Sequence, residues 1–302
     1  MPAPRVSILV CTHNRADILR DTLDSLTRVH LPPGGGELIV VDNASSDHTP
    51  AVFEEFVLAF PMPARLVREE KLGLSNARNR GVAEADGEIL AFLDDDAVCE
   101  PKWLIGLIEV YDRHPDAGCV GGRVLLDWKT PPPDWWSDSM NHHLSAVDYG
   151  DADRLTYPHY PYGASISFSR GVFADGRGFN PALGRRGDDL GGSEEMALCL
   201  RIEGDGGGVY YAPNSVVHHR AEGARANPDY LYRKSFAHGR SCARMEAAHF
   251  DRRFRMRKWV SFVLQGMDYA IRGRGVDGGC RWRYRAGYVL ETLRLALHGE
   301  AA

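Results

Sequence analysis

Three consecutive aspartates follow an apolar run near the middle of the first half of the chain. Asp94, Asp95 and Asp96 come directly after Ile-Leu-Ala-Phe-Leu at 89–93, a composition typical of a buried strand. Along an extended chain, Asp94 and Asp96 would point to one side and Asp95 to the other. Carboxylate oxygens are preferred ligands of Mg²⁺ and Mn²⁺, so a cation bound here would have positions left for a diphosphate. The simpler alternative is a solvated acidic loop.

Two other apolar runs also end in polar side chains. The run 6–11 is followed by Thr12, His13, Asn14 and Arg15, and the run 38–41 by Asp42 and Asn43. In open α/β sheets, ligands bind beyond the carboxyl ends of the strands. If these strands are parallel neighbours, the polar groups and the aspartates meet at one edge of the sheet, which predicts a ligand site there.

Several well-known sequence motifs are missing. No G-x-G-x-x-G follows the run 6–11, and the glycines at 34–36 precede a predicted strand, where they serve to turn the chain. The chain also has no Walker A sequence, no H-E-x-x-H and no G-x-S-x-G. These absences disfavour the dinucleotide, P-loop, zinc-protease and serine-hydrolase classes.

The first half alternates β-branched runs with helical spacing, which predicts βαβ units and a mostly parallel sheet. The expected strands are 6–11, 38–41, 65–68, 89–93, 119–126, 164–169 and 209–212. The expected helices are 18–26, one beginning after 43–47, 75–85, 101–111 and 194–203. The aromatic and proline-rich stretch 128–162 lacks periodicity and is expected to be a functional loop or lid. From residue 228 the pattern is helical.

Length and composition limit the class of protein. The 302 residues fit one large domain or a catalytic domain with an appendage. No apolar run approaches the ~18 residues of a membrane-spanning helix. Polar residues at 12–15 interrupt the N-terminal run where a signal peptide would continue. Six scattered cysteines without a C-x-x-C pair indicate reduced thiols, so we expect a cytoplasmic protein.

The net charge of −5 conceals a basic tail on an acidic body. Residues 220–300 contain 17 Lys and Arg against 8 Asp and Glu, and 252–259 and 281–285 interleave cations with aromatic side chains. Such helices can lie on the inner face of an anionic membrane as a peripheral contact. They could instead meet an anionic acceptor, pack on the acidic body or support self-association. Nucleic acid is the least favoured partner.

With these elements in place, the chain resembles the family 2 glycosyltransferases of GT-A fold, which transfer a sugar from a nucleotide sugar with inversion. The resemblance lies in V-S-I-L-V-C-T-H-N-R (6–15), L-I-V-V-D-N-A-S-S-D-H-T (38–49), G-L-S-N-A-R-N-R-G (73–81), G-E-I-L-A-F-L-D-D-D-A-V-C-E-P-K-W-L (87–104), Y-G-A-S-I-S-F-S-R (162–170), G-G-S-E-E-M-A-L-C-L-R-I (191–202) and A-P-N-S-V-V-H-H (212–219). These blocks cover about residues 5–220 in the expected order.

The resemblance implies a particular fold and division of the chain. The fold would be α/β, a GT-A type Rossmann-like and mostly parallel sheet flanked by helices. The catalytic domain would span 1–220, with a nucleotide-sugar part at about 1–126 and an acceptor-side part at about 127–220. Residues 221–302 would form a basic helical extension.

The resemblance also assigns the nucleotide side of the site. Thr12 and Asn14 would line the nucleobase and ribose pocket together with Arg15 and Asn43, and Asp42 would accept a hydrogen bond from the base. Each has a structural alternative. Thr12 and Asn14 could cap the following helix, and Asp42 could begin an Asx-turn.

The same family pattern assigns the diphosphate and metal side. Arg78 would approach the base or the diphosphate, although it could equally lie on a solvated helix face. Asp94, Asp95 and Asp96 would form the D-x-D motif, with Asp94 nearer the ribose and Asp96 on Mn²⁺ or Mg²⁺. One histidine of the 218–219 pair, His219 by its spacing from the preceding proline, would complete the metal or diphosphate site.

The family usually has its general base in an acidic pair at the start of a helix, which matches Glu194 and Glu195. Inverting transfer needs a carboxylate that takes the proton of the acceptor hydroxyl. We favour Glu195 and place Glu194 second. Acidic residues in a first helical turn also have a purely electrostatic explanation. Ala197 stands where relatives often have another acid, a departure on the acceptor side.

The sequence therefore predicts a metal-assisted inverting glycosyltransferase. Its donor would be UDP-, GDP- or dTDP-linked, and its acceptor is not indicated. A non-catalytic binding or scaffold protein of the same fold is the main alternative. A sugar-phosphate nucleotidyltransferase is a third, although that class normally has a glycine-rich loop after its first strand, which is absent here.

Overall fold

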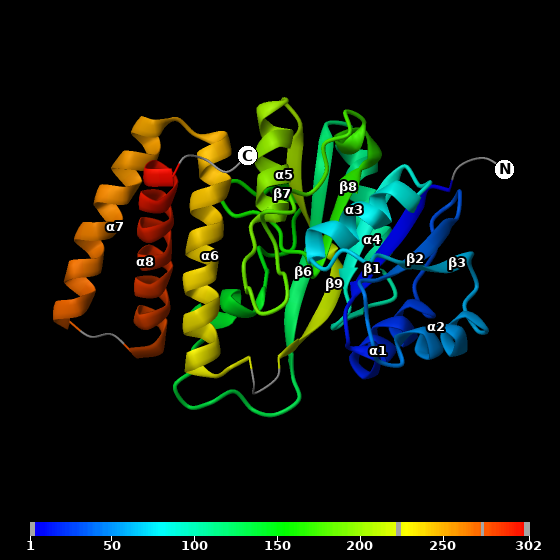
Figure 1. The fold of residues 1–302 in the computed structure, drawn as a ribbon. Helices are drawn as coiled ribbons and strands as arrows, with labels where there is room; N and C mark the ends of the chain where they lie inside the picture. The colour runs from blue at the N-terminus through cyan, green and yellow to red at the C-terminus, as the bar shows by residue number, and fades with distance from the viewer. Residues whose placement is uncertain (1–3, 222–224, 273–274, 299–302) are drawn as a thin grey trace.

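The computed structural model describes residues 4–221, 225–272 and 275–298, and in these ranges nine strands form one mixed sheet (Figure 1). Four neighbouring strands are parallel: β3 (Ala64–Arg68), β2 (Gly36–Asp42), β1 (Val6–Thr12) and β4 (Ile89–Asp94). The sheet continues beyond β4 through β8 (Ser165–Ser169), β6 (Ala117–Trp128), β9 (Gly208–Ala221) and β5 (Ala97–Cys99), while β7 (Arg154–Leu155) pairs with β9.

Alternating side chains of the central strands build two cores, one on each face of the sheet. In β1, Val6, Ile8 and Val10 belong to one buried cluster and Leu9 to the other, as the two-residue period of a strand requires. The first face is covered by α1 (Ala16–Leu26), α2 (Thr49–Val57) and α4 (Trp103–Arg113). The second is covered by α3 (Leu74–Glu84) and α5 (Glu194–Gly204). Apart from the buried Ser7, the strand run 6–11 is apolar because it is buried on both faces.

The strand order reverses at β1. The chain passes from β1 to β2 on one side, and β4 lies on the other side of β1. In open sheets, such a reversal leaves a crevice beyond the carboxyl ends of the two strands. The register pairs Thr12 with Asp42 and Cys11 with Asp94, so the polar ends of three strands lie at this crevice as predicted.

Two parts of the sheet differ from the sequence prediction. Asp95 and Asp96 form a two-residue turn between β4 and the short strand β5, so the aspartates are not an extended continuation of β4. The strand expected at 209–212 continues to Ala221 after a register shift opposite Gly122 and Arg123. Pro213 lies in this irregularity, where a residue without an N–H can be accommodated. The shift explains why the periodicity did not extend through the two histidines.

The C-terminal extension consists of three helices, α6 (Pro228–His249), α7 (Arg252–Arg272) and α8 (Gly275–His298). Figure 1 shows α6 beside the sheet domain, α7 outermost and α8 between these two helices. The α6–α8 contact is close because a Cβ on Gly239 would lie 2.0 Å from Tyr284 O, and one on Gly287 would lie 2.2 Å from Phe236 O. A larger residue at either position would force the helices apart.

The stretch 128–162, expected to be a loop, links β6 to β8 in sequence and packs against the extension. It contains the 3₁₀ helix η1 (Asp138–Leu144), and a second short one, η2 (Arg170–Phe173), follows β8. Met140 of η1 is buried with Leu231 of α6 and Cys280 of α8. All six cysteines are free. Among the helices of the described ranges, none combines the length and apolar character needed to cross a bilayer.

Candidate active site

A cavity of about 670 Å³ opens at the crevice between the ends of β1 and β4. Its walls come from three regions that are distant in the sequence. The strand ends contribute Thr12 and Asp94, the start of α5 contributes Glu195, and the extension contributes Lys234 and Tyr284. A cavity of this size is typical of a small-molecule or cofactor site.

The aspartate turn is held by a network of hydrogen bonds. Thr12 Oγ1 donates to Asp95 Oδ2 at 2.7 Å, and Arg15 donates to Asp95 Oδ1 at 2.5 Å and to Asp96 Oδ2 at 2.8 Å. Arg225, which follows β9, makes an ion pair with Asp96 Oδ2 at 2.6 Å. Burial raises the pKa of Asp95 to about 6, because the positive charge of Arg15 offsets only part of the effect of burial. The turn is therefore fixed in position before any ligand binds.

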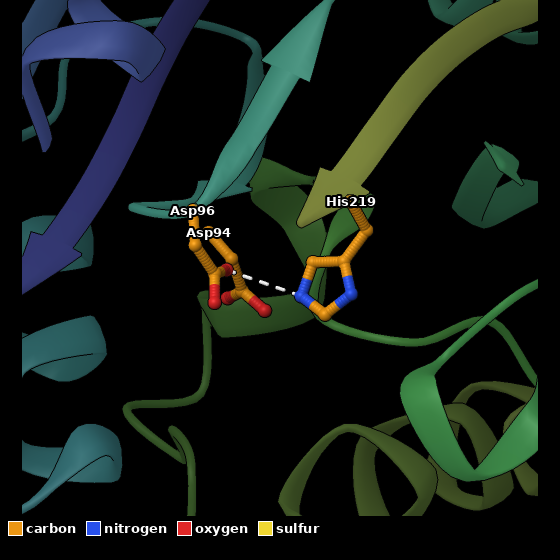
Figure 2. A group of neighbouring side chains, drawn as sticks. All are labelled: Asp94, Asp96 and His219. Atoms are coloured by element: carbon orange, nitrogen blue, oxygen red, sulfur yellow. Dashed lines mark ion pairs between the residues drawn. The ribbon is translucent and has the colours of Figure 1, made fainter. Parts of the chain in front are cut away.

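Asp94, Asp96 and His219 form a cluster with the composition of a metal site. One ligand atom from each lies within 4.8 Å of the others, and Figure 2 shows the three side chains directed toward one another from the ends of β4 and β9. His219 Nδ1 donates to Leu144 O at 2.9 Å. This bond leaves the Nε2 atom of His219 directed at Asp96 Oδ1, 3.1 Å away.

This geometry fits a divalent cation. When Nε2 carries no proton, it and the carboxylate oxygen are both acceptors, and a cation beside them would bind to both. The hydrogen bond from Nδ1 to a carbonyl is the usual arrangement of a metal-ligating histidine. The Asp94 side chain is 35% exposed and supplies an oxygen from the open side. Arg15 and Arg225 occupy Asp96 Oδ2 but leave Oδ1 available.

The positive neighbours also keep Asp96 ionised. Burial alone would raise the pKa of Asp96, but His219, Arg225 and Arg15 outweigh it and hold the pKa well below its usual range. An ionised carboxylate is the form that binds a metal. The electrostatics of the cluster therefore agree with its geometry.

A second acidic group lies across the cavity. Arg78 of α3 is buried, and its Nη1 atom donates to Glu194 Oε1 at 2.8 Å and to Glu195 Oε1 at 2.7 Å. Its Nη2 atom is 3.5 Å from Asp94 Oδ1. Arg78 is therefore neither on a solvated face nor turned away from the acidic groups. It links the carboxylates of α5 to the aspartate cluster.

The two glutamates differ in protonation. Burial and the charge of Glu195 raise the pKa of Glu194 to about 8, and Glu194 Oε2 has no hydrogen-bond partner among the described residues. Burial also acts on Glu195, but Arg78 outweighs it and holds the pKa of Glu195 below its ordinary value. The Glu195 side chain is 15% exposed and that of Glu194 is 3% exposed. Glu195 is thus the ionised and more accessible member of the pair.

Of the residues expected around a nucleotide, some line the cavity and others lie outside its lining. Asn43 lines the cavity, and its side chain is fixed by bonds to Glu69 O, Lys71 O and Gly73 N. Asp42 is not part of the lining, because its carboxylate accepts from Ser45 N and Arg68 Nη1. The bond from Ser45 spans three residues and not the two of an Asx-turn, so Asp42 holds the loop after β2 without forming the turn that the sequence left open.

Asn14 also lies outside the cavity lining. Its φ of 51° turns the side chain toward the loop after β2, where Oδ1 accepts from Ser46 N at 2.7 Å. Neither Thr12 nor Asn14 caps α1, since the Ala16 N–H donates to Asp47 Oδ2 instead. Thr12 remains in the lining, bound to Asp95, and Arg15 lines it too.

Several cavity residues were not identified from the sequence. Arg185, in the loop before α5, and Arg225, Lys234 and His143 all line the cavity. Each is a single polar residue in a stretch without a recognisable motif. Only the excess of positive charge after residue 220 pointed to any of them.

The sequence matches a known family. The profile described as "Glycosyl transferase family 2" matches residues 7–173. The glucosyl-dolichyl phosphate glucuronosyltransferase of Haloferax volcanii is 30% identical over 240 residues, which cover 78% of this chain and 76% of that protein. The succinoglycan biosynthesis protein ExoM of Rhizobium meliloti is 28% identical over 247 residues, covering 81% and 76%.

Solved structures share the fold over nearly the whole chain. The mannosyltransferase PcManGT of Pyrobaculum calidifontis, in complex with GDP-Man and Mn²⁺, has a TM-score of 0.61 at 18% identity and covers 99% of this chain and 77% of its own. TarS of S. aureus in complex with UDP has a TM-score of 0.53 at 15% identity and covers 97% and 91%. At these identities, the similarity concerns the fold.

Proposed function

The chain belongs to glycosyl transferase family 2, and we propose that it is an inverting enzyme that transfers a sugar from a nucleoside-diphosphate sugar to an acceptor hydroxyl. The predicted family, enzyme class and GT-A type fold are confirmed by these similarities. One observation carries the proposed reaction: the cluster of Asp94, Asp96 and His219 and the carboxylate of Glu195 line the same cavity. The ligands of PcManGT and TarS, GDP-Man with Mn²⁺ and UDP, support this type of donor.

The donor side of the site lies over the ends of β1, β2 and β4. There Thr12 and Asn43 present polar groups whose positions are fixed by hydrogen bonds to Asp95 and to the loop after β3. Asp94, Asp96 and His219 would hold Mn²⁺ or Mg²⁺, which supplies the positive charge that stabilises a departing diphosphate. Arg15 keeps the two carboxylates of the aspartate turn in place, so it acts as a positioning residue.

Glu195 is suited to be the base. It is ionised and exposed to the cavity, whereas Glu194 is buried and carries a proton at neutral pH because its pKa is about 8. In the proposed step, the acceptor oxygen bonds to the anomeric carbon as the bond to the diphosphate oxygen breaks, and the hydroxyl proton moves to Glu195. Arg78 positions Glu195 by holding Oε1, which leaves Oε2 for the acceptor.

A thermal-shift panel tests the proposal. UDP-, GDP- and dTDP-sugars would be added to the full-length protein with Mn²⁺ and, as a control, with a chelator. A ligand at 100 times its dissociation constant stabilises the native state by about 2.7 kcal/mol, so a specific donor raises the unfolding temperature visibly. Slow metal-dependent hydrolysis of the stabilising sugar would then exclude the non-catalytic scaffold alternative. A panel without any metal-dependent shift would count against the proposal.

We also propose that α7 contacts an anionic membrane surface from one side. Its exposed side chains include both cations and large apolar groups: Arg253, Phe254, Met256, Arg257, Val260 and Leu264. The apolar members are 44% to 63% exposed, which is unusual for an outermost helix in water. Aromatic and aliphatic groups beside arginines suit a lipid interface with negative headgroups.

A further inference from the structure

Two cations of the cavity wall have no close acidic partner among the described residues. Arg185 Nη2 lies 3.4 Å from the hydroxyl of Tyr230, and Lys234 Nζ donates to His143 O at 2.5 Å. Across residues 4–221, 225–272 and 275–298, no carboxylate oxygen lies within 4.0 Å of either cationic group. Both line the cavity, Arg185 from the loop before α5 and Lys234 from α6. They therefore form a positive area on the side of the cavity that the extension supplies.

The remaining lining charges are largely paired with one another. The lining contains seven Arg and Lys side chains and five Asp and Glu side chains. Arg15 and Arg225 pair with the aspartate turn, and Arg78 pairs with the two glutamates. Arg281 pairs with Asp277, which lies outside the lining. The excess of positive charge thus falls on the side of Arg185 and Lys234.

The proposed donor does not remove this excess. A nucleoside-diphosphate sugar carries about two negative charges at its diphosphate, and one divalent cation carries two positive charges, so their sum is neutral. With both bound at the aspartate cluster, Arg185 and Lys234 still have no carboxylate oxygen within 4.0 Å among the described residues, and Asp94 and Asp96 act on them only from a longer distance. A further anion would balance them.

The position of Lys234 disfavours its charged form. Burial, together with Arg185 and Arg225, lowers the pKa of Lys234 to about 7. Lys234 is therefore only partly charged at neutral pH, although Asp94 and Asp96 favour its ammonium form, and a bound anion would favour that form further. A cavity-lining amine that has no carboxylate oxygen within 4.0 Å in the part of the chain that the structure describes has the properties of a ligand subsite.

We propose that Arg185 and Lys234 bind a phosphate group of the acceptor, so that the acceptor carries a phosphate ester as well as the reacting hydroxyl. The inference rests on the proposed glycosyl transfer. A phosphate monoester carries nearly two negative charges, which matches two cations, and its three terminal oxygens can accept from a guanidinium fork and an ammonium together. A carboxylate would balance only one of the two. Tyr230 and Tyr284 line the same side of the cavity and would contact the body of the acceptor.

Binding of a small phosphate ester tests the subsite directly. The full-length protein is first saturated with the nucleoside diphosphate that binds best and with Mg²⁺. Phenyl phosphate is then titrated calorimetrically, with benzoate as the carboxylate comparison. The variants are Lys234→Met and Arg185→Met. Lys129→Met is the matched control, because Lys129 is 55% exposed and lies outside the cavity lining.

We expect phenyl phosphate to bind the wild-type protein and Lys129→Met equally, and at least tenfold more tightly than benzoate. Lys234→Met and Arg185→Met should each weaken it by about tenfold or more. Their affinity for the nucleoside diphosphate should change less than twofold. Equal phosphate affinity in all variants would overturn the inference. A tenfold loss of nucleotide affinity would overturn it too, because the two cations would then serve the donor diphosphate.

Folding and the underlying function are checked separately. Unfolding midpoints identify a variant that no longer folds. If one of Lys234→Met and Arg185→Met fails to fold, the phosphate affinity of the other variant still tests the subsite. If the wild-type protein binds no nucleotide, the proposed transfer fails. Titration of phenyl phosphate without nucleotide then still shows whether Arg185 and Lys234 bind phosphate.

Discussion

His219 Nε2 lies 3.1 Å from Asp96 Oδ1, although the two residues are more than a hundred positions apart in the chain. The pairing of β5 with β9 creates this contact, since Ala97 is in register with His219. The short strand β5 follows the aspartate turn directly, so it fixes the turn against the end of β9. The cluster of Asp94, Asp96 and His219 is therefore a consequence of sheet topology, because it depends on the pairing of β5 with β9.

Replacement of Glu195 by Gln should abolish sugar transfer. The amide cannot take the proton of the acceptor hydroxyl, and loss of a general base typically costs 10²–10⁴-fold in rate. The amide oxygen can still accept from Arg78, so nucleotide affinity should stay within about twofold. Transfer rates and calorimetric nucleotide binding are measured in parallel, with Glu203→Gln at the far end of α5 as the control. A variant that keeps most of its turnover would refute the assignment.

The α6–α8 pairing should depend on Glu291. Its buried carboxylate accepts from Arg240, Arg244 and Arg294 at 2.8–2.9 Å. Burial acts against ionisation, but the three arginines outweigh it and hold the pKa of Glu291 at about 2. Glu291→Gln should therefore lower the free energy of unfolding by ~2 kcal/mol at pH 7, because hydrogen bonds to charged groups are among the stronger ones.

The same carboxylate predicts a pH dependence of stability. Since its pKa is lower in the folded than in the unfolded protein, its contribution is complete above about pH 4.5 and is lost as the pH falls toward 2. Denaturant unfolding of wild type and Glu291→Gln at pH 7 and pH 3.5 should show the difference shrinking at the lower pH. Glu109→Gln is the control, since Glu109 is 47% exposed and its nearest ion-pair distance, to Arg113, is a long 4.0 Å. A pH-independent difference would contradict this account.

Membrane contact through α7 should require its exposed arginines. Each cation near an anionic surface contributes about 1 kcal/mol, so reversing Arg253 and Arg257 to Glu should reduce sedimentation with phosphatidylserine-containing vesicles by tenfold or more. Binding to purely zwitterionic vesicles should be weak for all variants. Reversal of Arg20 and Arg80, exposed arginines on α1 and α3, controls for total charge. Equal sedimentation of both double variants would exclude α7 as the contact.

Much of the fold was predictable because the apolar runs in the sequence coincide with the buried strands of the sheet. Apart from Ser7, the strand runs 6–11 and 89–93 are apolar since both faces of the central sheet are covered by helices. The aspartates and Thr12 were identifiable because they end such strands. Where the hydrophobic pattern of a segment matches its burial in the folded protein, periodicity is sufficient to predict the secondary structure of that segment.

The rest depended on long-range contacts that a single sequence does not show. The turn at Asp95 and Asp96 exists because β5 pairs with β9, and nothing in the three aspartates distinguishes a turn from an extended chain. The position of Arg78 follows from α3 and α5 covering the same face of the sheet, which brings Arg78 to Glu194 and Glu195. Arg185 and Lys234 became neighbours only when the extension closed one side of the cavity. Motif analysis therefore could not identify them as cavity residues.

The most direct test concerns the metal cluster, through calorimetric binding of a nucleoside diphosphate with Mn²⁺ and with a chelator. The account predicts that Mn²⁺ tightens binding by at least about tenfold in the wild-type protein. This gain should vanish in Asp94→Asn and His219→Gln. It should persist in His218→Gln, because His218 pairs with Glu100 outside the cavity. Equal affinity with and without Mn²⁺ in the wild-type protein, or a full metal effect in His219→Gln, would contradict it.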